Sequence, residues 1–149
     1  MFELIRSIRI EADHATGIAE VRADDPALLD HFPGRPILPG TWLVELAAQI
    51  AGPLAEAAIP DRWAVLAMIQ HAKLLAPVEL PATLRIEAAI QSLGARTETS
   101  LITVYTIAHH DALAVLRADL VFALIEAPPG SEAAVAARHA RLARWKAAP

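Results

Sequence analysis

The sequence predicts an α+β fold in which a long antiparallel β-sheet wraps around one central hydrophobic helix. Three observations predict it. Residues 41–58 form the best helix candidate of the chain, and its apolar residues lie on every side. Long strand candidates rich in Ile, Val, Leu and Thr follow this helix and are separated by hairpin-turn signals. A further strand precedes it, so the chain offers a strand, a buried helix and then a run of strands that can pair antiparallel.

Composition and charge narrow the class of protein. The chain has 149 residues, of which 55% are hydrophobic, a net charge of −4 at pH 7 and no cysteine. These values suit a soluble, cytoplasmic, globular protein. They argue against nucleic acid as the main partner, against a disulfide framework and against a thiolate zinc site. Polar residues or proline interrupt the longest apolar stretches, so no membrane span is expected.

The N-terminal elements lead into a stiff loop. Residues 18–22 have the composition of a strand, which Asp24-Asp25-Pro26 ends because proline disfavours helix in the residue before it. Residues 27–30 suit a short helical turn. Residues 31–40 then carry three prolines at a spacing of three, and these forbid helix and fix an extended path.

The helix at residues 41–58 begins after Pro39 and Gly40, which suit a helix entrance. Its body consists mostly of Leu, Ala, Glu and Gln, which favour helix. Because its apolar side chains surround the axis, we expect it to be buried on most of its circumference. Glu45 is then an acidic residue among apolar neighbours, and we expect burial to favour its neutral form.

After this helix the pattern changes to strands. Leu80-Pro81-Ala82 marks a bend before the first long strand. Two hairpin turns are expected, one at Gly94-Ala95 and one at His109-His110-Asp111. The strand candidates are residues 63–69, 72–77, 83–93, 97–108 and 113–125.

The chain divides into a main domain, residues 1–127, and a C-terminal helical tail, residues 128–149. Pro128-Pro129-Gly130 makes the break, and an Ala-rich helix follows it. The expected apolar stripe of this helix is Val135, His139, Leu142 and Trp145. The tail also holds a basic cluster, which is Arg138, Arg141, Arg144 and Lys146.

Acid–base chemistry is indicated at the loop and the helix. His31 begins the stiff loop, and Glu45 follows fourteen residues later on the helix that the loop enters. An elimination must take a proton from carbon and give one to a departing hydroxyl group, and a histidine and a buried carboxylic acid suit those two tasks. Gly40 allows close approach to the free N–H groups of the helix start, which can stabilise negative charge on a carbonyl oxygen.

These residues resemble a known family. Residues 31–40, followed by Glu45 and Gln49, resemble the signature of the β-hydroxyacyl-acyl-carrier-protein dehydratases of bacterial fatty acid synthesis. The family pattern is His-Phe-Pro-Gly-x-Pro-x-x-Pro-Gly, then a Glu five residues on and a Gln four residues after that, and every fixed position is present. Two departures, Asp30 where Gly is common and Leu80-Pro81-Ala82 in place of Pro-Gly-Asp, make a specialised member as plausible as the housekeeping enzyme.

The resemblance implies a hot-dog fold and a homodimer or a trimer of dimers, with His31 of one subunit facing Glu45 of the other. It implies His31 as the base at the α-carbon, Glu45 as the proton donor or orienter at the β-hydroxyl group, and the N–H of Gly40 on the thioester oxygen. Phe32, Pro39 and Gln49 are expected as further substrate contacts. The implied partner is an acyl carrier protein with a phosphopantetheine-linked substrate, and no metal or organic cofactor is implied.

Other functions stay open at this point. A hot-dog thioesterase also uses a helix carboxylate, but it does not need the His-Phe-Pro-Gly loop. A non-catalytic acyl-binding or partner subunit is expected to lose His31 or Glu45, and this chain keeps both. The pathway, whether fatty acid, polyketide or polyene synthesis, is not determined.

For several further residues, a structural role is weighed against a functional one. Adjacent histidines at His109 and His110 suit a solvated turn better than a metal site. Trp42 and Met68 suit core packing better than the lining of an acyl tunnel. The basic cluster of the tail suits a solvated helix face at least as well as a carrier-protein contact, for which the alternatives are Arg35, Lys73 and Arg85.

Overall fold

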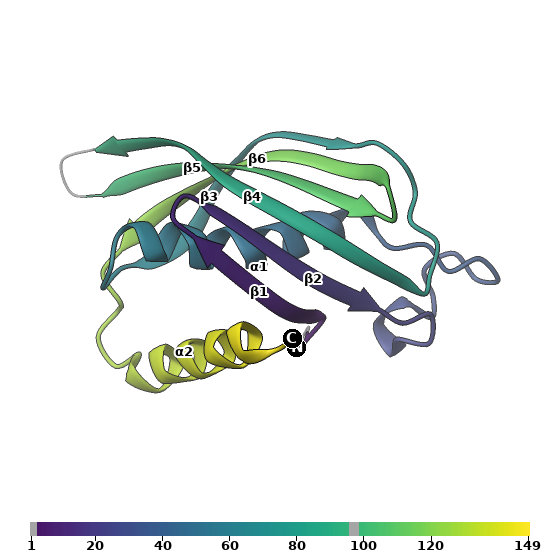
Figure 1. Ribbon diagram of the computed structural model, residues 1–149. Coiled ribbons are helices and arrows are strands. Elements are labelled where there is room, and N and C mark those ends of the chain that lie inside the picture. Colours follow the sequence, from purple (N-terminus) through teal and green to yellow (C-terminus); the bar gives the residue numbers. More distant parts are fainter. Residues whose placement is uncertain (1–2, 96–98) are drawn as a thin grey trace.

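The computed structural model describes residues 3–95 and 99–149. Within them, one six-stranded antiparallel sheet curves around helix α1 (Gly40–Ala58), and a second helix, α2 (Glu132–Ala147), lies across one end (Figure 1). The strand order is β1-β2-β4-β5-β6-β3. The strands are β1 (Ile5–Glu11), β2 (His14–Val21), β3 (Trp63–Leu74), β4 (Ala82–Ala95), β5 (Ser100–His110) and β6 (Leu113–Ile125). The expected long sheet around one helix is confirmed.

Most element positions agree with the sequence analysis. The helix expected at residues 41–58 begins one residue earlier, and the last strand has the expected bounds, residues 113–125. The run 63–69 and the first half of the run 72–77 form a single strand, β3, because no turn residue separates them, and residues 75–77 follow that strand. The strand expected at residues 18–22 begins at His14, where β2 pairs with β1 in a hairpin.

The turn expected at Gly94-Ala95 is wrong. Both residues belong to β4 and pair with Leu101 and Ser100 of β5, so the hairpin extends further than its glycine indicates. The expected start of the following strand, Thr97, lies outside the described residues. At the other hairpin, only Asp111 of the expected turn is in the turn, since the two histidines before it end β5.

Helix α1 packs its buried face into the concave side of the sheet. Leu46, Ile50 and Leu54, spaced by four residues, are almost completely buried. A glycine in β2 permits this close approach, because a Cβ atom at Gly17 would lie 2.1 Å from Cδ1 of Ile50. The helix is nevertheless not buried all round, since Thr41 and Glu45 on its other face are exposed.

Strand β3 lies at one edge of the sheet and exposes apolar side chains. Among the strands of the described residues, it pairs with β6 alone. The expectation that Met68 packs in the core is wrong, because 54% of it is exposed. Four more apolar residues of this strand share that exposure. They are Val65, Leu66, Ile69 and Leu74.

Helix α2 is attached to the rest of the fold. Trp145 is buried in the core cluster and Leu142 packs against that cluster. Arg144 donates to a carboxylate oxygen of Glu3 at 2.9 Å. Of the expected apolar stripe, His139 is the exception because it is exposed. No helix among the described residues is both long and apolar enough to cross a membrane.

Candidate active site

A short turn places His31 at the entrance of the proline-rich loop. The 3₁₀ helix η1 (Pro26–Leu28) is capped by Asp25, whose carboxylate accepts from the N–H of Ala27 at 2.9 Å. The N–H of His31 then donates to the carbonyl oxygen of Leu28 at 3.0 Å. The next residue, Phe32, has a φ of 57° and is exposed, with its ring edge-on to the His31 ring at 4.5 Å. The imidazole is thereby held half-buried at the surface.

The loop is also fixed along its far half. The N–H of Leu38 donates to the carbonyl oxygen of Val78 at 2.8 Å, and the N–H of Leu80 donates to that of Pro36 at 3.0 Å. Arg35 forms an ion pair with Glu79 beside them. These contacts hold the loop against residues 78–80, so the path to the start of α1 is fixed by hydrogen bonds as well as by its prolines.

Four of the expected site residues line one cavity. His31, Phe32, Pro39 and Gly40 surround a volume of about 400 Å³ whose remaining walls are apolar or proline residues. Those walls come from the loop, from α1 and from the segment that follows β3, and they are Ile37, Leu38, Leu43, Leu74, Leu75, Ala76 and Pro77. We call this the histidine cavity.

The start of α1 faces the histidine cavity without a side-chain cap. Its N-cap residue is Pro39, which makes no capping hydrogen bond through its side chain. The first N–H groups of a helix have no partner within the helix and carry its positive dipole end. Gly40 also lies close to Leu74, since a Cβ atom there would be 2.2 Å from Cδ1 of Leu74. Gly40, the first residue of α1, therefore lies at the wall of the cavity.

Glu45 and Gln49 lie together on α1. Nε2 of Gln49 donates to Oε1 of Glu45 at 2.9 Å, one helical turn apart. The expectation that Glu45 is buried is wrong for the single chain, because Glu45 is exposed. Oε1 of Gln49 is buried and has no hydrogen-bond partner among the described residues. A ligand or a water molecule can supply that donor.

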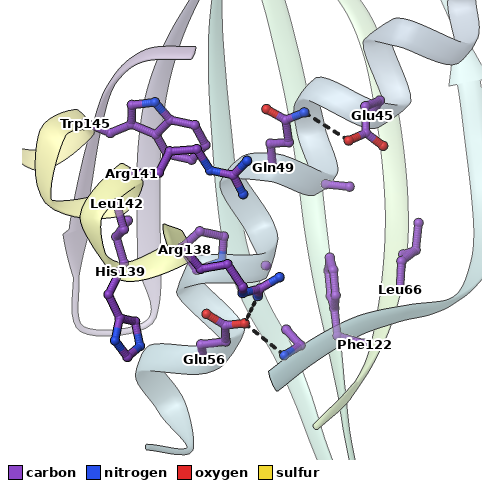
Figure 2. Close-up of a pocket in the computed structure, with 14 residues that line it drawn as sticks. Glu45, Gln49, Glu56, Leu66, Phe122, Arg138, His139, Arg141, Leu142 and Trp145 are labelled. Atoms are coloured by element: carbon purple, nitrogen blue, oxygen red, sulfur yellow. Dashed lines mark hydrogen bonds and ion pairs between the residues drawn. The ribbon is translucent and has the colours of Figure 1, made fainter. Parts of the chain in front are cut away.

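Glu45 and Gln49 line a second cavity, of about 220 Å³, which we call the glutamate cavity. Figure 2 shows Glu45 and Gln49 at one end and an ion pair between Glu56 and Arg138 at the other. The wall between them comes from α1, from strands β3 and β6 and from α2. It includes Gly52, Pro53, Ala64, Leu66, Phe122, Leu142 and Trp145.

The pairing of Glu56 with Arg138 was not predicted from the sequence, where Arg138 was considered only within the basic cluster of the tail. The spacing on α1 could have indicated Glu56, because it follows Glu45 by eleven residues, about three turns, and so lies on the same face of the helix. Arg138 comes from α2, which carried no motif. The side chains meet only because the tail folds back over α1.

One chain does not bring His31 and Glu45 together. They line different cavities, and the two cavities share no lining residue. On α1, Glu45 is five residues from Gly40, which is roughly 7.5 Å along the axis and roughly 140° around it. The two halves of the expected catalytic pair are therefore on different faces of the same subunit.

Most of the basic residues considered as carrier-protein contacts make ion pairs within the chain. These pairs are Arg35–Glu79, Arg85–Glu87, Arg138–Glu56 and Arg144–Glu3. Lys73 lies exposed on β3. In the part of the chain that the structure describes, no group of three or more His, Cys, Asp or Glu side chains is placed to hold a metal ion.

Comparison with known proteins identifies the family of this chain. Residues 7–112 match the family described as ApeI-like, ApeI dehydratase. The 3-hydroxyacyl-[acyl-carrier-protein] dehydratase FabZ of Solibacter usitatus (strain Ellin6076) is 33% identical to this chain over 132 residues, which are 85% of this chain and 79% of that protein.

Solved structures share the fold at low identity. Cj0977, a sigma28-regulated virulence protein from Campylobacter jejuni, superposes with a TM-score of 0.61 at 15% identity, over 85% of this chain and 88% of its own. The thioesterase HI1161 from Haemophilus influenzae does so with a TM-score of 0.57 at 20% identity, over 80% and 78%. The expected hot-dog fold is confirmed, and at these identities the likeness concerns the fold alone.

Proposed function

Because this chain belongs to the ApeI-like dehydratase family, we propose that it removes water from a 3-hydroxyacyl thioester carried on an acyl carrier protein. The product is the trans-2-enoyl thioester. One observation carries the proposal, namely the complete loop of residues 31–40, held rigidly at a cavity and followed on α1 by Glu45. The FabZ relative is named for the same reaction on the same carrier.

The side chains divide the reaction between them. His31 takes a proton from the α-carbon while Glu45, as a carboxylic acid, gives a proton to the departing β-hydroxyl group, which leaves as water. The α–β double bond forms from the electron pair of the broken C–H bond. Negative charge that develops on the thioester oxygen is stabilised by the N–H of Gly40, at the uncapped start of α1.

We place the reaction between two copies of this chain. His31 of one copy and Glu45 of its partner then face the same substrate, which agrees with their separate cavities in one chain. The exposed apolar residues of β3 lie at a sheet edge, as expected of a strand that another subunit covers. A second copy would also cover Glu45, which is exposed in one chain. A dimer, alone or as a trimer of dimers, meets these requirements.

Further residues have supporting roles in the proposal. Phe32 and Pro39 contact the thioester arm where they line the histidine cavity. Gln49 orients Glu45 through their hydrogen bond and contacts substrate through its buried Oε1. The absence of cysteine suits work in the reducing cytoplasm.

The first test compares two reactions of the purified protein. We expect 3-hydroxydecanoyl-acyl-carrier protein to lose the mass of one water molecule, and decanoyl-acyl-carrier protein to stay intact, because the proposed roles of His31 and Glu45 serve elimination and need a β-hydroxyl group. Mass spectrometry of the intact carrier protein measures both. Release of the free acid from the saturated thioester would instead favour a thioesterase. A folded dimer that leaves both unchanged would favour a non-catalytic acyl-binding role.

A further inference from the structure

The glutamate cavity follows one stripe of α1. Glu45, Gln49, Gly52 and Glu56 lie at helical positions i, i+4, i+7 and i+11, so they share a face of the helix. At 1.5 Å per residue, this stripe is roughly 16 Å long. It begins at the carboxylate that acts on the β-carbon in the proposed reaction. The acyl chain beyond the β-carbon therefore has a path along the stripe.

Helix α2 makes one wall of this path. Leu142 and Trp145 line the cavity while they also pack on the core, and Leu66 and Phe122 of the sheet lie across from them (Figure 2). The matched family region ends at residue 112, so α2 lies outside it. The wall belongs to this chain's own C-terminal segment.

An ion pair forms the far end of the path. The Glu56 carboxylate bonds to the Arg138 guanidinium and accepts from the N–H of Ala64 at 3.0 Å. The same guanidinium lies over the Trp63 ring, 5.0 Å from its centroid. The Glu56 side chain is only 19% exposed and that of Arg138 35%, so contact with this pair removes water from it. An alkyl end pressed against it would desolvate both charges and offer no hydrogen bond in return.

We propose that the Glu56–Arg138 pair, held in place by α2, limits the length of acyl chain that the enzyme accepts. The inference rests on the proposed function, since it assigns a substrate class to that same site. Carbon–carbon bonds of about 1.5 Å at about 111° advance an extended chain by about 1.25 Å per bond. A 3-hydroxydecanoyl group extends about 9 Å beyond its β-carbon and fits. A 3-hydroxyhexadecanoyl group extends about 16 Å and meets the ion pair.

The test measures kcat/KM for 3-hydroxybutyryl, 3-hydroxydecanoyl and 3-hydroxyhexadecanoyl thioesters on one carrier protein. For the wild-type protein we expect the ten-carbon substrate to exceed the sixteen-carbon substrate by roughly tenfold or more. The double variant Glu56→Gln with Arg138→Met removes both charges, while Gln keeps an acceptor for the N–H of Ala64. We expect the ratio of kcat/KM between the ten-carbon and sixteen-carbon substrates to fall roughly tenfold in this variant, since an apolar end then tolerates the alkyl chain.

The matched control is Glu3→Gln with Arg144→Met. It removes an ion pair between α2 and the N-terminal segment that does not line the glutamate cavity. We expect it to keep the wild-type length preference. Melting temperatures verify that both variants fold.

The outcomes separate the two proposals. Equal use of ten-carbon and sixteen-carbon substrates by the wild-type protein would overturn the length limit and leave the dehydratase in place. A folded Glu56→Gln, Arg138→Met variant that keeps the wild-type ratio of kcat/KM between these two substrates would overturn it as well. Failure to dehydrate any of the three substrates would reject the proposed function, and the inference with it.

Discussion

Replacement of His31 by Ala is expected to lower kcat for dehydration by roughly 10²–10⁴-fold, the usual contribution of a positioned general base. The Ala side chain cannot take the α-proton, and among the described residues that line the histidine cavity His31 is the one histidine. Glu45→Gln is expected to cost a similar factor. Gln has the shape of Glu and can still bond to Gln49, but it cannot donate a proton as an acid does. Steady-state rates with 3-hydroxydecanoyl-acyl-carrier protein measure both effects.

The matched control for His31 is His14→Ala. His14 is exposed at the start of β2 and pairs with Asp13 at 2.6 Å, away from both cavities. We expect wild-type rates from this variant. If His31→Ala retained more than about a tenth of the wild-type rate, it would contradict the role of His31 as the base.

Met68→Asp is expected to separate the dimer and to remove activity. A carboxylate at the centre of the exposed apolar face of β3 would have to be buried against another subunit without a partner, which is strongly unfavourable. The chain alone would then elute with its own mass of 15.9 kDa instead of twice that or a higher multiple. Light scattering on a sizing column measures the mass, and the same fractions are assayed for dehydration.

Leu93→Asp is the control for that substitution. Leu93 is 60% exposed on β4, compared with 54% for Met68, but it lies in the β4–β5 hairpin rather than on the edge strand β3. We expect it to leave the mass and the rate unchanged. A Met68→Asp protein that kept the wild-type mass would show that β3 is not the interface, whatever its activity.

Local sequence signals predicted much of the fold and of the loop. The three prolines predicted a stiff loop at residues 31–40, and the family resemblance of that loop implied His31, Phe32, Pro39 and Gly40 as site residues; all four line the histidine cavity. Strand β6 was predicted at its full length, because its apolar run ends at clear turns. These features depend on neighbours in sequence.

The features that were missed depend on distant contacts. Glu56 and Arg138 are 82 residues apart, and no motif in either segment predicts that they meet. Met68 was expected in the core because it belongs to an apolar run, but a hydrophobic strand at a sheet edge is equally suited to a subunit interface. The exposure of Glu45 has a similar origin, because the burial inferred from its neighbours in sequence is not supplied by its own chain.

The most direct test of the composite site uses a dimer of two different variants. His31→Ala and Glu45→Gln chains are expressed together with different affinity tags, and the mixed dimer is purified through both tags. We expect about half of the wild-type rate, because one of the two symmetric sites then combines an intact His31 with an intact Glu45 from the other chain. If His31 and Glu45 acted within one chain, the mixed dimer would contain no intact pair. A rate no higher than that of either variant alone would therefore contradict the account.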